Sequence, residues 1–192
     1  MPSPVGHVLA GVAAAWIVQA APGPSRSRRL AARGVPLACA LLAVAPDADI
    51  VLATHRAVSH SVGAVGVIVA LAAAVARWRG WPLLATMAAA AAAFGSHMLL
   101  DWLGQDTSLP QGIMALWPFS DRYFVSGLDV FARVSRRYWL PEQFIVGNAW
   151  SVAREVLILG PVAVLAWLWR RQASRALPSV PAPTSVRSDA VL

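Results

Sequence analysis

The sequence predicts an all-α fold, an integral membrane helical bundle with about five membrane-spanning helices. Two features support this prediction. Hydrophobic residues make up 58% of the 192 residues and charged residues 13%, whereas a soluble domain has about 25% charged residues. The apolar residues are also gathered into long runs with polar breaks between them. Such a chain is neither disordered nor an ordinary soluble domain.

The apolar runs are the candidate spans. A bilayer core of about 30 Å needs about 20 helical residues, with about 17 as the lower limit. The first and third runs are shorter than this unless their polar flanks are counted. Ser3 and Pro4 form a favourable helix start, because a serine caps the helix and a proline at the first position loses no hydrogen bond. The runs are 8–21, 35–53, 62–76, 81–103 and 152–169.

The arginines predict the orientation of the bundle. All 16 basic residues are arginine, and they concentrate in the breaks after the first and third runs and just after the last run. Short cytoplasmic loops carry an excess of positive charge. We therefore expect the N-terminus on the outer side of the plasma membrane and the C-terminus in the cytoplasm. These arginines are then near anionic lipids. They are Arg26, Arg28, Arg29, Arg33, Arg77, Arg79, Arg170, Arg171 and Arg175.

Two stretches lie outside the predicted spans. Residues 104–151 form an extracytoplasmic loop in this topology, and within it 128–139 is a candidate helix on the membrane surface. Residues 172–192 are expected to be a disordered cytoplasmic tail, which leaves 1–171 as the membrane-embedded domain. In the loop, acidic residues balance the arginines along the sequence. These charged residues are Asp106, Asp121, Arg122, Asp129, Arg133, Arg136, Arg137 and Glu142.

Composition also limits the partners. The single cysteine, Cys39, lies in an apolar run, so neither a disulfide framework nor a thiolate metal site is expected. A net charge of +7 raises nucleic acid as a partner, but no basic stripe with interleaved aromatic residues occurs outside the membrane flanks. We therefore expect membrane lipids as partners and no nucleic acid. The oligomeric state does not follow from the sequence.

All four histidines fall at one membrane face of this topology, together with three aspartates. The arginines alone predict that topology, so the agreement between the two sets of residues is independent support. Ionisable side chains at membrane depth are costly, and they usually have partners or a function. The residues are His7, Asp47, Asp49, His55, His60, His97 and Asp101.

The spacing of His97 and Asp101 limits the roles that this pair can have. They are four residues apart and project from one helix face, which suits two ligands of one metal ion or a structural hydrogen-bonded pair. Neutral imidazole and carboxylate are typical ligands of a catalytic zinc or related ion, which makes a nucleophile from water at neutral pH. The other residues also have plainer interpretations: His7 as an interfacial residue, the two neighbouring aspartates as a loop or cap, and Arg56 as a contact to lipid phosphates.

Five short segments have an order and spacing that are specific when taken together. They are Gly6-His7, Pro46-Asp47-Ala48-Asp49, His55-Arg56 leading to Ser59-His60-Ser61, Ser96-His97-Met98-Leu99-Leu100-Asp101, and Leu116-Trp117-Pro118. In these segments the chain resembles the YdjM-like family of small bacterial inner-membrane proteins, which are described as membrane-bound metal-dependent hydrolases. The resemblance implies a multi-pass helical protein of the bacterial inner membrane with a metal-dependent hydrolase site.

A more distant similarity is to the zinc-dependent phospholipase C and P1 nuclease group of helical phosphoesterases. It implies that four residues hold one ion, zinc or a related divalent metal, and that His7 and Asp101 hold a second, with Asp101 bridging. The secreted enzymes of that group also use the free amino terminus and further His and Glu ligands. No histidine follows His97 here, so we expect one or two ions. The four residues are Asp47, His60, His97 and Asp101.

The first functional hypothesis is a membrane-bound metal-dependent hydrolase that cleaves a phosphoester of a lipid or lipid-linked substrate at the outer face of the membrane. The catalytic candidates are Asp49 to orient or deprotonate water, His55 to protonate the leaving group or act as an extra ligand, and Arg56 to hold a phosphate oxygen. A second hypothesis is a non-catalytic metal-binding or proton-coupled protein, such as a transporter or sensor. Polar residues gathered at one face argue against a transport path. A third is a structural membrane protein whose cluster only joins helices.

Overall fold

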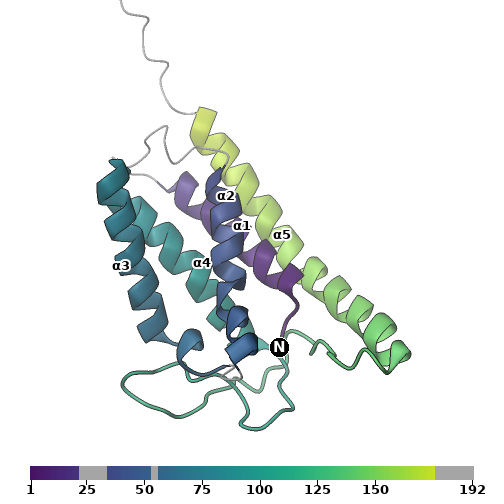
Figure 1. Ribbon diagram of the computed structural model, residues 1–192. Helices are drawn as coiled ribbons and strands as arrows, with labels where there is room; N and C mark the ends of the chain where they lie inside the picture. Colours follow the sequence, from purple (N-terminus) through teal and green to yellow (C-terminus); the bar gives the residue numbers. More distant parts are fainter. Residues whose placement is uncertain (22–33, 53–55, 176–192) are drawn as a thin grey trace, which may run out of the picture.

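The computed structural model of the chain describes residues 1–21, 34–52 and 56–175, and these contain no β-strand. The helices form a bundle (Figure 1). The α-helices are α1 (Pro4–Ala20), α2 (Gly34–Val44), α3 (Val62–Arg79), α4 (Leu83–Leu103) and α5 (Asn148–Arg175), with the 3₁₀ segments η1 (Ala45–Leu52) and η2 (Val58–His60) and the π-helical segment η3 (Glu142–Gly147).

The prediction of an all-α membrane bundle is confirmed. Three helical stretches are long and apolar enough to cross a membrane: α3, α4 and the continuous helix Glu142–Arg175. α1 is also apolar, and its 17 residues lie at the lower limit for a span. α2 is shorter than the run that predicts it. It ends just before Pro46, which lacks an N–H and whose ring clashes with a preceding carbonyl of an α-helix, and the chain continues as η1.

Small residues let the helices pack closely around α1. α1 packs against α2, α4 and α5, whereas α3 stands at the edge and packs against α4 (Figure 1). At the contact between α1 and α2, a Cβ added to Gly11 would lie 2.6 Å from the Cys39 oxygen and 2.7 Å from the Ala43 Cβ. Such close approach is typical of helices in membranes. Buried alanines dominate these contacts, among them Ala10, Ala13, Ala15, Ala89, Ala93, Ala163 and Ala166.

The start of α1 is held by a buried glutamate of α5. Ser3 caps the helix as predicted, because its Oγ accepts from the N–H groups of Val5 at 3.2 Å and Gly6 at 3.4 Å. Glu155, which is fully buried, accepts from the Ser3 N–H at 2.6 Å, from the Ser3 hydroxyl and from the Gly6 N–H at 3.0 Å. A carboxylate at a helix N-terminus also interacts favourably with the helix dipole. The first turn of α1 is therefore fixed to α5.

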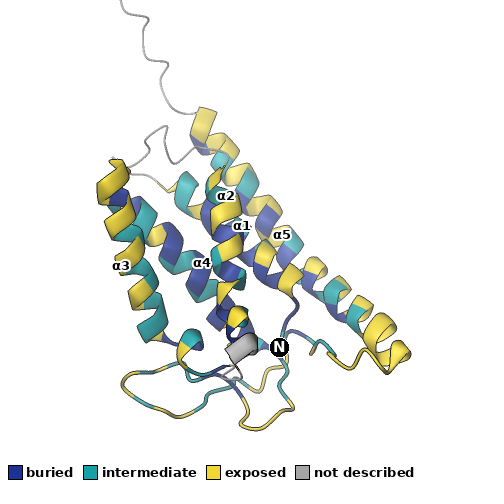
Figure 2. Ribbon diagram, in the orientation of Figure 1, coloured by how far each residue is buried: buried dark blue, intermediate teal, exposed yellow. Residues whose placement is uncertain are grey.

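The boundaries of the predicted loop and tail need correction. The last helix begins at Glu142 instead of 152, so the connection after α4 covers 104–141, and α5 continues to Arg175, four residues past the predicted end of the membrane domain. The early part of this helix is largely exposed (Figure 2). The rest of the predicted tail, 176–192, lies outside the described residues.

The predicted surface helix at 128–139 is wrong, since this stretch is not helical. Its backbone groups bond to other parts of the chain. The Val130 N–H donates to the Leu103 oxygen at 2.9 Å, and the Phe131 oxygen accepts from the Gln105 N–H at 2.8 Å. These contacts to the end of α4 satisfy groups that a local helix would otherwise pair with each other.

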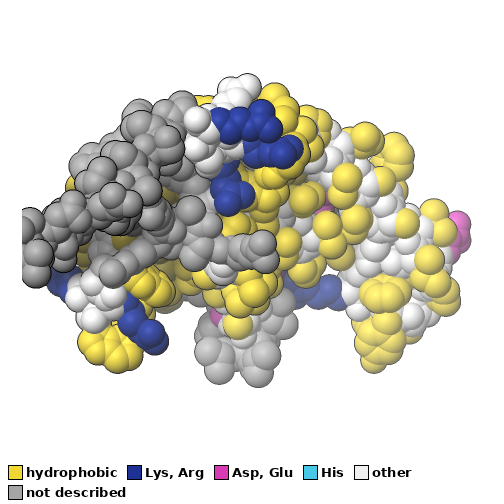
Figure 3. Space-filling model, turned by 90° about the horizontal axis from the view of Figure 1, so that it is seen from above, with side chains coloured by type: hydrophobic (Ala, Val, Ile, Leu, Met, Phe, Trp, Pro, Cys, Tyr) yellow, Lys and Arg dark blue, Asp and Glu magenta, His cyan; other side chains and the backbone are white. Residues whose placement is uncertain are grey.

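The bundle has two ends (Figure 1), and their side chains differ chemically. At one, which we call the arginine end, α1, α3 and α5 finish, and Figure 3 looks onto it and shows arginine side chains among hydrophobic ones. The opposite end, which we call the histidine end, is where α1 and α5 begin and α2 and α4 finish. The arginine end holds Arg77, Arg79, Arg170, Arg171 and Arg175. Arg26, Arg28, Arg29 and Arg33 lie outside the described residues.

Candidate metal centre

Four segments bring five of the predicted site residues together at the histidine end. His7 lies in the first turn of α1, Asp47 in η1 and His60 at the end of η2, while His97 and Asp101 lie in the last two turns of α4. The three histidines and Asp101 are at most 1% exposed. The side chain of Asp47 is 19% exposed. The centre is thus enclosed by the bundle and reachable on the Asp47 side.

The donor nitrogens of His60 and His97 lie close to one carboxylate oxygen of Asp101 and to one of Asp47, at distances suited to ligands of a small cation. The Nε2 atoms of His60 and His97 are 3.0 Å apart, and they lie 3.3 and 3.1 Å from Oδ2 of Asp101. Oδ1 of Asp47 lies 3.9 and 3.8 Å from the same two nitrogens. Two donors on a tetrahedral zinc ion, each about 2.1 Å from it, are about 3.4 Å apart. The observed distances lie on both sides of that value.

Hydrogen bonds determine which ring nitrogens are available as ligands. Nδ1 of His97 lies 2.8 Å from the Ala43 carbonyl oxygen, which only accepts, so this nitrogen carries the proton. The single hydrogen of the Ser59 hydroxyl goes to Asp49, so the Ser59 oxygen accepts from Nδ1 of His60 at 2.9 Å. In the neutral rings, both Nε2 atoms therefore present lone pairs to the centre.

This arrangement fits a cation. The two Nε2 lone pairs face each other and face a carboxylate, whereas protons on both nitrogens would bring two hydrogens together across 3.0 Å. Both oxygens of Asp101 are buried and have no hydrogen-bond partner in the described part of the chain. Buried groups of this kind are costly unless something compensates them. Imidazole and carboxylate are the donors that zinc and related divalent ions take, so the cluster could hold a metal ion.

His7 gives the centre a second potential position. Its ring stacks on that of His97, with centroids 3.9 Å apart, and its Nε2 lies 3.6 Å from Oδ1 of Asp101. Both ring nitrogens of His7 are buried without a hydrogen-bond partner among the described residues. Asp101 thus points one oxygen toward His7 and the other toward His60 and His97, which is the geometry of a bridging carboxylate.

Asp49 lies beside His60, on the side away from the cluster. One of its oxygens is 3.3 Å from Nδ1 of His60, accepts from the Ser59 hydroxyl and accepts from the Arg56 N–H at 3.2 Å. A carboxylate behind a ligand histidine fixes its ring and raises its basicity. This geometry favours positioning of His60 over direct contact with a water at the ion.

Arg56 connects the residues around His60 to the loop after α4. Its φ of 71° is unfavourable for a residue with a side chain, and the backbone is held on both sides by the bond to Asp49 and by the Met114 N–H, which donates to the Arg56 oxygen at 3.0 Å. The guanidinium pairs with Asp106. His55, the other predicted catalytic residue of this segment, lies outside the described residues.

The Leu116-Trp117-Pro118 segment, one of the five segments that carry the family resemblance, has a structural role at the start of α3. The Trp117 oxygen accepts from the Gly63 N–H at 3.0 Å, and the Ala115 oxygen accepts from the Val62 N–H at 2.9 Å. A Cβ added to Gly63 would lie 2.7 Å from the Trp117 ring. These contacts occupy free N–H groups of the first turn of α3, which begins two residues after His60.

Three supporting residues were not predicted as part of the site. Ser59 stands in the Ser59-His60-Ser61 segment, but nothing in that segment marks its hydroxyl as the partner of the His60 ring. Asp106 is a polar loop residue with no spacing pattern that marks it as the partner of Arg56. Glu155 had a usable signal, because it is the one acidic residue in the last apolar run, and an acid at membrane depth usually has a partner. Its partners, Ser3 and Gly6, lie at the other end of the chain and could not be inferred from that position.

Comparison with known proteins agrees with this structure. A family model described as YdjM inner membrane protein matches residues 1–177, which include all the helices and every residue of the cluster. No curated protein and no solved structure matches the chain. The three stretches long and apolar enough to cross a membrane suit such a protein. The chain therefore belongs to the YdjM inner membrane protein family.

Proposed function

We propose that this protein is a metal-dependent hydrolase that cleaves a phosphoester of a lipid or lipid-linked substrate at the outer face of the membrane. The observation that carries the proposal is the convergence of His7, Asp47, His60, His97 and Asp101 at one end of the bundle. A cluster that only joined helices would satisfy its polar atoms internally. Here the buried atoms of His7 and Asp101 have no such partner within the described chain.

The residues divide into ligands and supporting groups. Asp47, His60, His97 and Asp101 hold one divalent ion, zinc or a related metal, and His7 with Asp101 offers a second position. A bound ion lowers the pKa of a water ligand to about 7 and polarises the phosphoryl oxygens. The chain supplies the enclosure that keeps this chemistry away from bulk water.

The remaining residues act on the substrate or on the ligands. Substrate enters past Asp47, the most exposed of the ligand side chains. Asp49 and Ser59 hold the His60 ring in the orientation that directs Nε2 to the centre. Arg56 offers its remaining N–H groups to a phosphate oxygen, and His55, one residue before it, protonates the leaving oxygen.

A lipid substrate follows from where the site lies. The centre is at the end of a bundle of apolar helices, so the ester bond of a lipid headgroup can reach it from the bilayer surface. The same arrangement argues against a transporter, because within the described residues both potential metal clusters lie at the histidine end and a transport path needs polar sites near the midplane.

The orientation is part of the proposal. With the arginine end in the cytoplasm, the C-terminus lies inside and the centre faces outward. Fusion of alkaline phosphatase to the C-terminus should give no phosphatase activity in cells, and fusion of green fluorescent protein should give fluorescence. The reverse result would place the centre on the cytoplasmic side and contradict the proposed orientation.

The test of the function is metal content followed by turnover. The purified full-length protein should contain one or two equivalents of a divalent metal and should hydrolyse a chromogenic phosphodiester or a fluorescent phospholipid. Asp47→Ala removes the ligand whose side chain is partly exposed and should reduce turnover by more than about 100-fold, since loss of an outer-shell partner alone costs 10- to 100-fold. Asp101→Ala should do the same.

The matched control is Asp121→Ala, which removes an exposed carboxylate of the loop after α4 and should leave metal content and turnover unchanged. Thermal unfolding of each variant shows that the fold is intact. Metal bound without turnover on a broad panel of phosphoesters would contradict the hydrolase and favour a metal-binding sensor. Absence of stoichiometric metal would contradict both and favour a structural cluster.

A further inference from the structure

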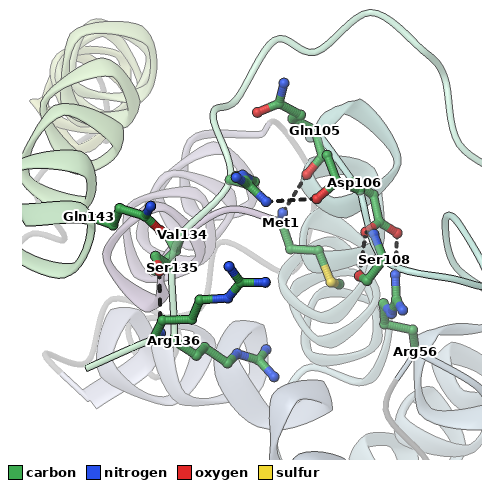
Figure 4. Close-up of a pocket in the computed structure, with 12 residues that line it drawn as sticks. Met1, Arg56, Gln105, Asp106, Ser108, Val134, Ser135, Arg136 and Gln143 are labelled. Atoms are coloured by element: carbon green, nitrogen blue, oxygen red, sulfur yellow. Dashed lines mark hydrogen bonds and ion pairs between the residues drawn. The ribbon is translucent and has the colours of Figure 1, made fainter. Parts of the chain in front are cut away.

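A second polar site lies at the histidine end, beside the candidate metal centre. It is a cavity of about 390 Å³, and the four arginines that line it are Arg56, Arg133, Arg136 and Arg137. Figure 4 shows it between the segment from Val134 to Arg136 on one side and Asp106, Ser108 and Arg56 on the other. No proposed metal ligand lines it. The cavity is therefore a separate site that adjoins the centre through Arg56.

The charge of this cavity is strongly positive. Asp106 is the one carboxylate among its lining residues, and it pairs with Arg56. Burial, which raises the pKa of Asp106, is outweighed by hydrogen bonds from Gly112 and Ser108 and by the charge of Arg56, so the pKa lies below its usual range. Asp106 is thus ionised at neutral pH and balances one arginine. The lining therefore holds four arginines and one carboxylate.

The backbone that carries these arginines is held in place. The side-chain amide of Asn148 accepts from the Ser135 N–H at 2.7 Å and donates to the Ser135 oxygen at 2.9 Å. The hydroxyl of Ser151, which is 2% exposed, lies 3.0 Å from the Arg133 oxygen and 3.0 Å from the Gly147 oxygen and shares its hydrogen between them. The Val134 N–H donates to the Met1 oxygen at 3.2 Å. A fixed backbone reduces the entropy lost when a ligand binds.

The arginine side chains themselves reach across the cavity. The guanidinium of Arg133 donates to the Thr107 hydroxyl at 2.9 Å, which joins the two walls of the site. Arg133, Arg136 and Arg137 are exposed, so the cavity is open to a ligand. Guanidinium groups bind phosphate oxygens through paired N–H donors.

We propose that this cavity binds a phosphate-bearing group, the headgroup of the lipid or lipid-linked substrate, beside the metal centre. The volume of the cavity, about 390 Å³, lies within the range of about 300 to 1,000 Å³ that is usual for small-ligand sites, so there is room for a phosphate with an attached polar group. The substrate role rests on the proposed hydrolase function. The binding itself does not, because the arginines and the ion occupy different places.

The binding test uses the full-length protein in detergent, stripped of metal with a chelator, and phosphatidic acid as the probe. The double variant Arg136→Gln, Arg137→Gln should lower affinity for phosphatidic acid at least 10-fold. The matched control, Arg170→Gln with Arg171→Gln, removes the same charge from the arginine end and should bind as the wild type does. Thermal unfolding reports the fold, and Arg133→Gln provides a second variant of the same site.

Competition identifies the form of phosphate that is recognised. Displacement of phosphatidic acid by millimolar inorganic phosphate shows that a free phosphate suffices, and resistance to it shows that the lipid-borne group is required; both agree with a phosphate site in the cavity. Equal losses in the two double variants would indicate general attraction between arginines and lipid charge and would overturn the proposal. Unchanged binding in the Arg136 and Arg137 variant would also overturn it.

Turnover separates this inference from the function on which it rests. In an active enzyme, the Arg136→Gln, Arg137→Gln variant should raise KM at least 10-fold for a lipid substrate that carries a second phosphate in its headgroup and leave kcat unchanged, because the cavity holds this second phosphate away from the reacting bond. If the protein hydrolyses nothing but the variant still loses phosphatidic acid binding, the proposed function fails and the phosphate site stands. If hydrolysis is observed and KM does not change, the phosphate site fails alone.

Discussion

The two ends of the bundle use the same residue type in different ways. At the arginine end, guanidinium groups lie on neighbouring aromatic rings: Arg79 over Trp78 at 4.6 Å and Arg171 over Trp167 at 4.4 Å from the ring centroids. At the histidine end, Arg56 is buried and pairs with a carboxylate, and its backbone is bonded on both sides. Exposed arginines on helix ends are suited to lipid contact. Arginines held by long-range backbone bonds are suited to binding a defined ligand.

The two ends also differ in their buried ionisable side chains. Several ionisable groups are enclosed at the histidine end, including His7 and Asp101, whose polar atoms lack a hydrogen-bond partner in the described residues. Among the described residues, the arginine end has no buried ionisable side chain. If the proposed ion is bound, its removal should therefore act on the histidine end and leave the arginine end unchanged.

The largest expected effect is that of metal removal. If the centre holds an ion at 1,000 times its Kd, binding contributes about 4 kcal/mol to stability, so addition of a chelator should lower the unfolding temperature clearly. Proteolysis or hydrogen exchange should show that the loss begins at η2 and the end of α4. An unfolding temperature that does not respond to the chelator would contradict a bound metal. A response centred on the arginine end would contradict its position.

The second effect concerns Glu155. Glu155→Ala leaves two backbone N–H groups and the hydroxyl of Ser3 without their acceptor, and an unsatisfied buried group costs about 1 to 3 kcal/mol. We expect a loss of about 3 kcal/mol in the free energy of unfolding and weaker metal binding, since His7 follows directly on Gly6. Chemical denaturation in detergent measures the first and metal titration the second. The matched control, Glu142→Ala at an exposed position, should change stability by less than about 0.5 kcal/mol.

The third effect compares two helical glycines. In Gly11→Ala, the new Cβ would meet the Cys39 oxygen and the Ala43 side chain, and overpacking of this kind costs about 2 kcal/mol. In Gly66→Ala, the Cβ would meet nothing within 4 Å, so the helix propensity of alanine should stabilise α3 by about 0.5 kcal/mol. Unfolding of the two variants should therefore shift in opposite directions. Shifts of the same sign would contradict the close contact between α1 and α2.

The smallest effect is the pH dependence of stability due to Asp106. Its pKa is lower in the folded protein than in the unfolded chain, so Asp106 contributes stability above its unfolded pKa of about 4. That contribution is lost as the pH falls through the lower, folded value. Wild type should therefore lose more stability than Asp106→Asn when the pH is lowered from 6 to 3, as measured by thermal unfolding. Parallel curves for the two proteins would contradict the role of Asp106.

Much of the fold could be predicted from the sequence, because apolar runs and helix caps are local signals. The start of α1 at Ser3 and Pro4 followed from capping chemistry alone. The end of α2 was harder to predict, since the run of apolar residues continues through Pro46. The helix predicted for 128–139 was wrong because the backbone of this stretch bonds to residues distant in sequence, such as Leu103 and Gln105. These hydrogen bonds outweigh the local preference for a helix.

The candidate site could also be predicted only in part. The spacing of His97 and Asp101 predicted two side chains on one helix face, and the positions of the other histidines predicted the rest of the cluster. The arginines of the loop were expected to be balanced by nearby acids. In space Asp106 alone of those acids lines the cavity, so charge balance along the chain did not predict charge balance around the site.

The contact between Ser3 and Glu155 also bears on how the protein is made. The partners are 152 residues apart, so the first helix leaves the ribosome long before the last one is synthesised. Until α5 arrives, the N–H groups of Ser3 and Gly6 lack this acceptor, and the turn that carries His7 lacks its support. Translation order therefore makes the His7 side of the cluster the last to be completed, after the whole bundle has been inserted.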